Sequence, residues 1–280
     1  MSGKLSLVTG ASSGIGKATA SRLAGAGWNV VMVCRDRARG EAVMSEIVNQ
    51  TKNQSVELMV ADLSSLSSVR KLASDFGAKH SSLEVLVNNA GVFKSGRLTT
   101  PDGFELMFAT NYLGPFLLTR LLIPSLETAS TSRVVNVTAP STTRPNLDDL
   151  QGERKFSTIG AFGASKAADL LFTYALARRL AGQGITVNAY HPGLVRTSLN
   201  QGAPGAIRAL SGLMNLFVGR TPEKASEGLV QLATSDDFAA TNGQLVHDGK
   251  VISAPFIEDK DLQETLWTKT CALVGLSETL

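Results

Sequence analysis

Short apolar runs alternate with longer amphipathic segments along most of this chain. The apolar runs have the length of buried β-strands, and the segments between them repeat their apolar residues at helical spacing. We expect strands at Leu5–Thr9, Val30–Cys34, Val56–Val60, Leu83–Asn88, Arg133–Thr138, Ile185–Tyr190 and Gln244–Val246. We expect helices at Ile15–Ala26, Arg37–Gln50, Ser65–Ala78, Phe104–Leu126 (with a kink at Pro115), Ala161–Ala181 and Pro222–Thr234.

This alternation predicts an α/β fold, namely a single Rossmann-type, doubly wound parallel sheet with helices on both faces. No linker rich in Pro, Gly or Ser divides residues 1–280, so we expect one domain. The segment 197–220 interrupts the alternation before the last helix. It is rich in glycine and apolar residues, and we interpret it as a substrate flap in which Met214, Leu216 and Phe217 contact the substrate.

Composition excludes several classes of function. The 280 residues are 43% hydrophobic and 18% charged, with a net charge of +3 spread along the chain, so nucleic-acid binding is not expected. The two isolated cysteines, Cys34 and Cys271, and the dispersed histidines predict neither disulfides nor a metal site and suit a cytoplasmic location. The sequence has no uninterrupted apolar stretch of about 18 residues, so we expect no integral membrane segment.

A glycine-rich turn, Thr9–Gly16, joins the first strand to the first helix. Gly10 permits a tight turn, Gly14 lets the backbone approach a pyrophosphate at the helix N-terminus, and Gly16 lets the helix pack closely on the strand. Ser12, Ser13 and Ile15 complete the turn. The context of strand, turn and helix predicts a site for a nicotinamide dinucleotide.

The second strand ends at Cys34, and Arg35 and Asp36 follow it. An acidic residue at the strand end would bind the ribose 2′-hydroxyl of NAD, whereas Arg35 can pair with a 2′-phosphate. We therefore expect NADP(H) to be preferred over NAD(H). Lys17, just past the turn, is a second cation for this phosphate, and the alternative for Arg35 is a solvated charge.

Together these motifs resemble the short-chain dehydrogenase/reductase family over nearly the whole chain. Thr9–Gly16 is similar to its TGxxxGIG turn, and Asn88-Asn89-Ala90-Gly91 to its NNAG motif, which stabilises the central sheet and borders the cofactor. The resemblance implies further roles at matching positions: adenine binding by Asp62 and Leu63, a proton relay through Asn111, and orientation of the nicotinamide by Pro192, Gly193 and Thr197.

The branch most resembled is the retinol-dehydrogenase-like one. The similarity lies in Cys34–Asp36, in Asp149–Glu153 and in Leu171–Leu180. This resemblance implies NADP(H) as cofactor and a lipophilic small-molecule alcohol or carbonyl as substrate.

The chain departs from the family at two catalytic positions. The family uses a tyrosine four residues before a lysine to move the proton, with a serine that orients the carbonyl oxygen. Lys166 is present and is expected to hold the cofactor ribose, but the tyrosine position is Phe162 and the serine position is Ala139. Phenylalanine cannot transfer a proton, and alanine cannot donate a hydrogen bond.

Several interpretations remain open. In the first, the chain is an oxidoreductase whose proton comes from Lys166 through water and the Asn111 relay, with Ser141, Thr138 or Thr142 orienting the substrate oxygen. Reduction of an activated alkene would be slowed least by the loss of the general acid, because it does not require protonation at the centre that accepts the hydride. In the second, the cofactor is structural and the chemistry is a cyclisation or isomerisation. In the third, the chain is a pseudoenzyme or ligand sensor. In a fourth interpretation, Phe162 is a laboratory substitution of the tyrosine. The second departure at Ala139 argues against this, because it indicates that the whole site differs by lineage.

Two further expectations concern the surface and the end of the sixth strand. The long helices Phe104–Leu126 and Ala161–Ala181 suit a helix-packed homodimer, with a homotetramer as the alternative. His191 either faces the ligand or only shapes the backbone before Pro192, and we favour the second.

Overall fold

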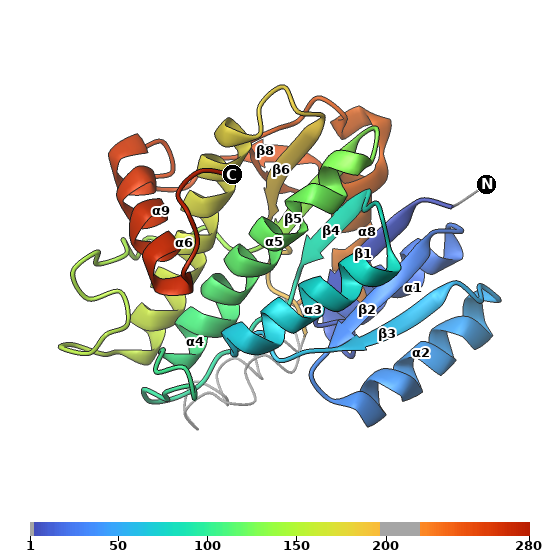
Figure 1. The fold of residues 1–280 in the computed structure, drawn as a ribbon, viewed down its shortest axis with the longest axis horizontal. Coiled ribbons are helices and arrows are strands. Elements are labelled where there is room, and N and C mark those ends of the chain that lie inside the picture. Colours follow the sequence, from blue (N-terminus) through green and yellow to red (C-terminus); the bar gives the residue numbers. More distant parts are fainter. Residues whose placement is uncertain (1–2, 197–218) are drawn as a thin grey trace.

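A computed structural model describes residues 3–196 and 219–280, and it contains one eight-stranded sheet (Figure 1). The strand order is β3-β2-β1-β4-β5-β6-β7-β8, and all neighbours are parallel except β7 and β8. The strands are β1 (Leu5–Thr9), β2 (Asn29–Cys34), β3 (Val56–Val60), β4 (Val85–Asn88), β5 (Ser132–Val137), β6 (Ile185–Tyr190), β7 (Leu245–His247) and β8 (Lys250–Ile252). The Rossmann-type prediction is confirmed, and the wholly parallel sheet is corrected at β8.

The described helices are α1 (Gly14–Gly25), α2 (Arg37–Thr51), α3 (Leu66–Lys79), α4 (Leu106–Phe108), the π-helix η1 (Ala109–Leu113), α5 (Gly114–Thr128), α6 (Thr158–Arg179), α8 (Pro222–Thr234), the 3₁₀-helix η3 (Asp236–Phe238) and α9 (Lys260–Val274). Sequence patterns did not predict η3 or α9. The signals for α9 are Asp259, whose side chain caps its first turn, and Gly275, which ends it at φ +64°.

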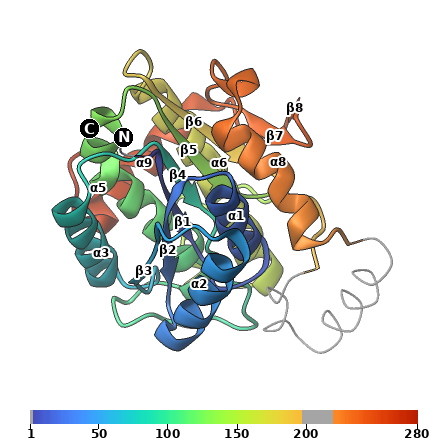
Figure 2. The same ribbon diagram turned by 90° about the vertical axis from the view of Figure 1, so that its right-hand side faces the viewer.

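Helices cover both faces of the sheet (Figure 2). Adjacent strand residues point to opposite faces, so Leu7 joins the core under α3, α5 and α6, while Val8 joins the core under α1, α2 and α8. Both side chains are fully buried. This double burial explains why the parallel strands read as continuous apolar runs.

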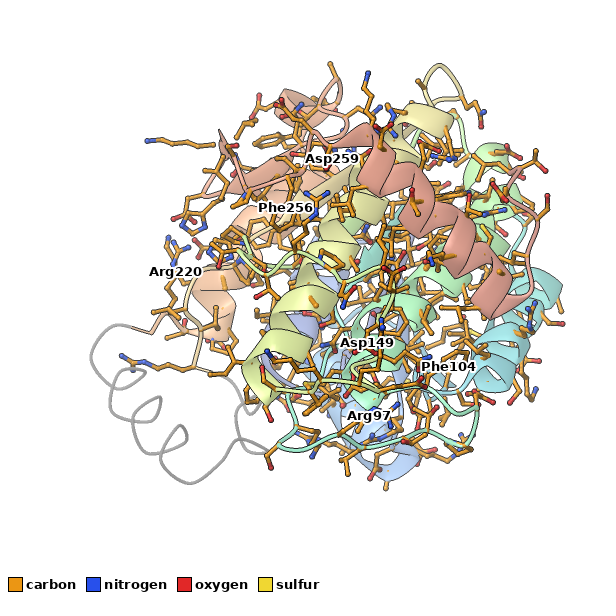
Figure 3. All side chains as sticks on the ribbon, turned by 90° about the vertical axis from the view of Figure 1, so that its left-hand side faces the viewer. Arg97, Phe104, Asp149, Arg220, Phe256 and Asp259 are labelled. Carbon is orange, nitrogen blue, oxygen red and sulfur yellow. The ribbon has the colours of Figure 1, made fainter. Side chains whose placement is uncertain are left out.

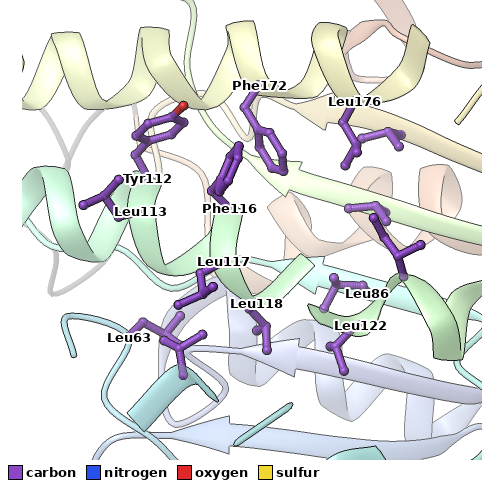
Figure 4. Packing of buried hydrophobic residues seen from close by; sticks show 14 of the residues in the cluster. Leu63, Leu86, Tyr112, Leu113, Phe116, Leu117, Leu118, Leu122, Phe172 and Leu176 are labelled. Atoms are coloured by element: carbon purple, nitrogen blue, oxygen red, sulfur yellow. The ribbon is translucent and has the colours of Figure 1, made fainter. Parts of the chain in front are cut away.

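Aromatic rings fill the core between η1, α5 and α6 (Figure 4). Phe116 lies 4.9 Å from Phe172 and 5.1 Å from Trp267 of α9, measured between ring centroids. α9 is therefore part of the main core, and it packs against α6.

The helix expected over Phe104–Leu126 is not continuous. Its π-helical part, η1, ends just before Pro115, which has no N–H to donate to the Asn111 carbonyl four residues earlier. The interruption therefore falls at Asn111. Within the described chain, Leu106–Thr128 is long and apolar enough to cross a bilayer, but 83% of its apolar 18-residue window is buried, as in the core helix of a globular fold.

The strand order reverses between β1 and β4, which is where open α/β sheets bind ligands. The carboxyl ends of β1, β4, β5 and β6 meet the N-terminus of α1 along this edge. Most of the sequence motifs follow these strands, whereas Arg35 follows β2 and Asp62 follows β3.

Candidate functional site

Two positions in the turn after β1 require glycine. Gly10 has φ +67°, and a Cβ there would lie 2.9 Å from the Cα of Ala90. A Cβ on Gly16 would collide with the Gly10 carbonyl and the Asn89 side-chain amide. The turn is therefore pressed against the segment after β4.

Hydrogen bonds fix the two segments together. The Thr9 hydroxyl accepts from the main-chain N–H groups of Asn89 (2.9 Å) and Ala90 (3.0 Å), and the Asn89 side chain donates to the Thr9 carbonyl (2.9 Å). Asn88 donates to Asn136 on the next strand at 2.8 Å. The sheet-stabilising role implied for this motif fits these contacts.

The N-terminus of α1 presents uncapped N–H groups. Ser13 is its N-cap, but its side chain makes no capping hydrogen bond, and the first turn has no acidic residue. The N-caps of α2, α3, α6, α8 and α9 all accept a hydrogen bond from their first turn. Ser12 instead interacts with the Cys34 thiol, and Ile15 packs on the core. An anion such as a pyrophosphate fits the uncapped end of α1.

The end of β2 leaves Arg35 exposed. The Asp36 carboxylate is used locally, because it accepts from the Arg39 N–H at 2.9 Å and caps α2. Arg39, not singled out from the sequence, lies close enough to Cys34 to lower the pKa of its thiol, against the larger upward effect of burial. Lys17 does not fit its expected role as a second cation for the 2′-phosphate, because its amino group pairs with Glu46 on α2 at 2.7 Å.

The expected adenine contacts follow β3. Asp62 accepts hydrogen bonds from the main-chain N–H (2.9 Å) and hydroxyl (2.7 Å) of Ser64. Leu63 is buried against Gly114 at the start of α5. Both residues lie at the same sheet edge as the glycine turn.

Lys166 reaches the carboxyl end of β5 from α6. Its side chain is buried, and its Nζ donates to the Val137 carbonyl at 3.0 Å. A Cβ on Gly91 would lie 3.8 Å from this Nζ, so the loop after β4 borders it. Burial lowers the pKa of Lys166, and the charge of Asp169 opposes this effect.

Phe162 lies one helical turn before Lys166. Its ring meets that of Phe93, and it belongs to an apolar cluster with Val92, Met107, Phe156 and Ala161. An apolar wall thus stands where the family places a phenol.

Three hydrogen bonds hold the Asn111 side chain in place. Its Oδ1 accepts from the Val92 N–H at 2.7 Å, and its Nδ2 donates to the Val92 carbonyl at 3.0 Å and to Ser165 at 3.1 Å. Ser165 in turn donates to the Phe162 carbonyl at 2.8 Å. The main-chain carbonyl of Asn111 lacks its α-helical donor, because Pro115 has no N–H, so this carbonyl is our candidate for the relay.

The three hydroxyls after β5 that could orient a substrate oxygen differ in their burial and hydrogen bonds. Ser141 is buried beside Gly163 of α6 and accepts from the Thr143 N–H at 3.1 Å. Thr138 donates to the Lys166 carbonyl at 3.0 Å, so it is not free to orient a substrate, and this corrects its expected role. Thr142 is exposed, and Ala139 is partly exposed at the strand end.

Pro192 and Gly193 follow β6 at the same edge. The rings of His191 and His247 are tilted by 38° with centroids 4.9 Å apart. Burial, followed by the charge of His247, lowers the pKa of His191. A Cβ on Gly193 would lie 3.3 Å from His247. Thr197 and nearly all of the expected flap, including Met214, Leu216 and Phe217, lie outside the described residues.

The loop that contains Arg97 contacts the loop that contains Asp149 (Figure 3). Arg97 donates to the Gln151 carbonyl at 3.1 Å, and Asp149 accepts from the N–H of Glu153 at 2.7 Å. The motif Asp149–Glu153 is therefore a structural loop that closes over the segment before α4.

A hollow in the described residues lies elsewhere. It measures about 460 Å³ and is formed by the second half of α6, the segment before β7 and the start of α9. None of the expected site residues lines it, so we place the site from the converging motifs instead. No group of three metal-ligating side chains occurs in residues 3–196 and 219–280.

Comparison with known proteins gives consistent results. The family model described as short chain dehydrogenase matches residues 4–206. Retinol dehydrogenase 13 of Homo sapiens is 39% identical over 283 residues, covering 98% of this chain and 85% of that protein. The crystal structure of an uncharacterized protein from Mycobacterium paratuberculosis is 32% identical, with a TM-score of 0.78 and coverage of 99% and 95%. RhlG of Pseudomonas aeruginosa, in an active-site complex with NADP, is 27% identical, with a TM-score of 0.70 and coverage of 89% and 96%.

Proposed function

The chain belongs to the short-chain dehydrogenase family, and from this membership we propose that it is an NADP(H)-dependent oxidoreductase with a non-standard proton donor. Its proposed substrate is a lipophilic small carbonyl compound, an alcohol or an activated alkene. We also propose that residues 1–280 form one NAD(P)-binding domain, because a single sheet joins strands from Leu5 to Ile252.

One observation carries this proposal: the residues expected to hold the cofactor are present, while the two hydroxyl-bearing side chains that the family uses beside it are replaced by Phe162 and Ala139. The uncapped N-terminus of α1 and the buried Lys166 lie at the same sheet edge. When bound there, the nicotinamide supplies or accepts the hydride. The residues that would hold this cofactor are Gly10, Ser12, Ser13, Gly14, Ile15, Gly16, Arg35, Asp62, Leu63, Asn89, Ala90, Gly91, Lys166, Pro192, Gly193 and Thr197.

NADP(H) is preferred in this proposal because the carboxylate after β2 is already used. Asp36 caps α2, so it does not compete for a ribose hydroxyl, and Arg35 stays exposed. Arg39 adds a second positive charge near Cys34. Two cations at a strand end suit a 2′-phosphate better than a hydroxyl. The NADP complex of RhlG supports this choice.

The proton has to come from a group other than Phe162. In the proposal Lys166 supplies it through a water molecule that the Asn111 carbonyl holds, and Ser141 orients the substrate oxygen. General acid catalysis contributes about 10²–10⁴-fold, so a poor donor slows carbonyl reduction without abolishing hydride transfer. The apolar wall around Phe162 and Phe93 suits a lipophilic substrate. The retinol dehydrogenases among the relatives fit that substrate class.

A second candidate function follows from the same two positions. Phe162 and Ala139 remove both hydroxyls that the family uses, which also suits non-redox chemistry on a structural cofactor, such as a cyclisation or isomerisation, or ligand sensing. We keep a cytoplasmic location in the proposal because Cys34 and Cys271 are both buried free thiols. The homodimer or homotetramer also stays a prediction.

The test is NADPH oxidation by the purified protein with a panel of lipophilic aldehydes, ketones and enones. The proposal expects turnover with at least one of them, and the fastest turnover with enones. Gly14→Val is the matched control, because a side chain there blocks approach to the pyrophosphate and should leave only background oxidation. Tight NADPH binding without turnover of any acceptor contradicts the redox function and favours the second candidate.

A further inference from the structure

A line of buried polar side chains crosses the core next to the candidate site. Asn88 and Asn136 are paired neighbours on β4 and β5, while Thr119 lies on α5 and Thr173 on α6. None of these four side chains is more than 3% exposed. A polar group in an apolar core costs free energy unless it is hydrogen-bonded, so the partners of these four determine what they do.

The hydrogen bonds run from the sheet toward α6. Asn88 Nδ2 donates to Thr119 Oγ1 and to Asn136 Oδ1, both at 2.8 Å. Asn136 Nδ2 donates to Thr173 Oγ1 at 2.9 Å, and the Thr173 hydroxyl donates to the Asp169 carbonyl at 2.9 Å. Because a hydroxyl has one proton, Thr173 can only accept from Asn136, which fixes the orientation of the Asn136 amide.

The face of α6 that meets this line also carries Lys166. Lys166 lies seven residues before Thr173, which is two helical turns, so both side chains point to the same side. Lys166 Nζ donates to the Val137 carbonyl at 3.0 Å, and the Lys166 carbonyl accepts from Thr138 at 3.0 Å. Asn136, Val137 and Thr138 are consecutive, so the end of β5 contacts α6 at two separate turns.

These contacts set how far α6 can slide along β5. The rise of an α-helix is about 1.5 Å per residue, so a slide by one residue would take a bond of 2.9 Å out of hydrogen-bond range. It would also leave the buried amide of Asn136 without its acceptor. The bond from Asn136 to Thr173 therefore opposes any displacement of α6 that moves Lys166.

We propose that Asn136 and Thr173 are positioning residues that set the place of Lys166 at the cofactor edge of the sheet. The inference rests on the proposed function, in which Lys166 holds the cofactor ribose. Both residues act only through α6. They keep the helix in register with β5, so that Lys166 Nζ stays at the carboxyl end of that strand.

The direct test removes the acceptor on α6 and follows Lys166 in the cofactor-free protein. Thr173→Val keeps the shape of the side chain but cannot accept from Asn136. The ¹⁵N NMR signal of a lysine Nζ, detected through the neighbouring Cε protons, responds to its hydrogen bond, and Lys166→Met identifies the Lys166 signal by its loss. We expect Thr173→Val to shift this signal. An unmoved signal overturns the proposal.

Thr119→Val is the matched control. It makes the same substitution at a fully buried threonine and removes the other acceptor of Asn88, but Thr119 is on α5. An equal shift of the Lys166 signal in this variant overturns the specific role of Thr173. Thr173→Ser retains the hydroxyl and should leave the signal in place, and a shift as large as that of Thr173→Val contradicts the proposal.

Thr173→Cys is the second variant should Thr173→Val not fold. A thiol is only a weak acceptor, so the Lys166 signal should shift in the same direction by a smaller amount. An unmoved signal in Thr173→Cys overturns the proposal in that case.

NADPH affinity separates the positioning role from the proposed function. Thr173→Val should weaken NADPH binding about threefold, and it should cause no further loss when added to Lys166→Met, because coupled residues are not additive. A further loss in the double variant shows that Thr173 acts otherwise than through Lys166 and overturns the proposal. A shifted Lys166 signal with unchanged affinity in Lys166→Met contradicts only the cofactor role of Lys166. Weaker binding by Lys166→Met, with neither signal nor affinity changed in Thr173→Val, contradicts only the positioning role.

Discussion

The ring of Phe162 meets the ring of Phe93 edge-on, with centroids 5.1 Å apart and planes inclined by 74°. Edge-to-face contacts of this kind stabilise aromatic pairs beyond simple burial. The tyrosine position of the family has therefore become part of an apolar wall, one helical turn from a buried lysine.

Restoring the family hydroxyls should improve carbonyl reduction. Phe162→Tyr adds a phenol one turn from Lys166, whose charge lowers the pKa of that phenol, and Ala139→Ser adds a donor at the strand end. We expect the double variant to reduce lipophilic aldehydes at least about tenfold faster, since general acid catalysis contributes about 10²–10⁴-fold. Steady-state NADPH oxidation measures this. Phe156→Tyr, in the same apolar cluster, is the control and should give no gain; an equal gain there, or none in the double variant despite cofactor binding, would contradict the prediction.

Arg35 should set the choice of cofactor. We expect NADPH to bind more tightly than NADH, and Arg35→Ala to reduce this preference about tenfold because a charge-assisted contact to the 2′-phosphate is lost. Fluorescence titration with both cofactors measures the ratio. Arg37→Ala, whose side chain pairs with Glu41 at 3.6 Å, should leave the ratio unchanged. Equal affinity of the unmodified protein for the two cofactors would exclude the role of Arg35.

Lys166 should contribute to cofactor affinity as well as to proton supply. Lys166→Met keeps an apolar stem but loses the hydrogen bonds to the ribose, so NADPH should bind about tenfold more weakly. Isothermal titration of the two proteins gives the difference. Lys71→Met, on the exposed face of α3, is the control. Unchanged affinity in Lys166→Met would mean that its amino group stays on Val137 when cofactor binds.

Gly16→Ala should lower the unfolding free energy of the protein. The added Cβ would meet the Gly10 carbonyl and the Asn89 amide, and such overpacking costs about 1–3 kcal/mol of unfolding free energy. Gly77→Ala is the contrasting control, because Gly77 is exposed in α3 and a Cβ there meets nothing within 4 Å. This change should stabilise the protein by about 0.5–1 kcal/mol. Urea unfolding measures both, and similar effects of the two changes would show that the turn can relax.

Asp169 should make stability depend on pH. Its pKa rises from 3.8 to about 7 in the fold, so the folded state binds this proton more tightly than the unfolded chain does. The contribution is complete below the unfolded pKa and is lost as pH rises through about 7. Asp169→Asn lacks this loss, so it should gain stability relative to the unmodified protein between about pH 4 and pH 7. Denaturation at several pH values tests the sign, and a relative loss would show that Lys166 keeps Asp169 ionised.

The strands could be predicted more sharply than the helices. Leu5–Thr9, Val56–Val60 and Ile185–Tyr190 agree residue for residue, and a polar or glycine residue precedes each run. The interruption at Ala109–Leu113 could not be located, since a proline kink does not by itself specify a π-helix. α9 was missed although its caps were visible.

The site was predictable where a motif fixed a residue on an element. Lys166 was expected to hold the cofactor ribose, and its Nζ lies at the carboxyl end of β5, near Gly91. Contacts between distant helices were not predictable, so Lys17 was taken as free although it pairs with Glu46. Asn136 and Thr173 attracted no attention in the sequence, because their significance comes from a buried hydrogen bond between β5 and α6 rather than from a motif.

The hairpin of β7 and β8 has a consequence for behaviour at high concentration. Asp248 and Gly249 take φ values of +48° and +73°, as a two-residue type I′ hairpin requires, so β8 turns back antiparallel at the end of the sheet. β8 is three residues long and carries the exposed Lys250. An edge that is this short and charged offers a poor template to the backbone of another molecule, so this fold is protected at that edge from edge-to-edge aggregation.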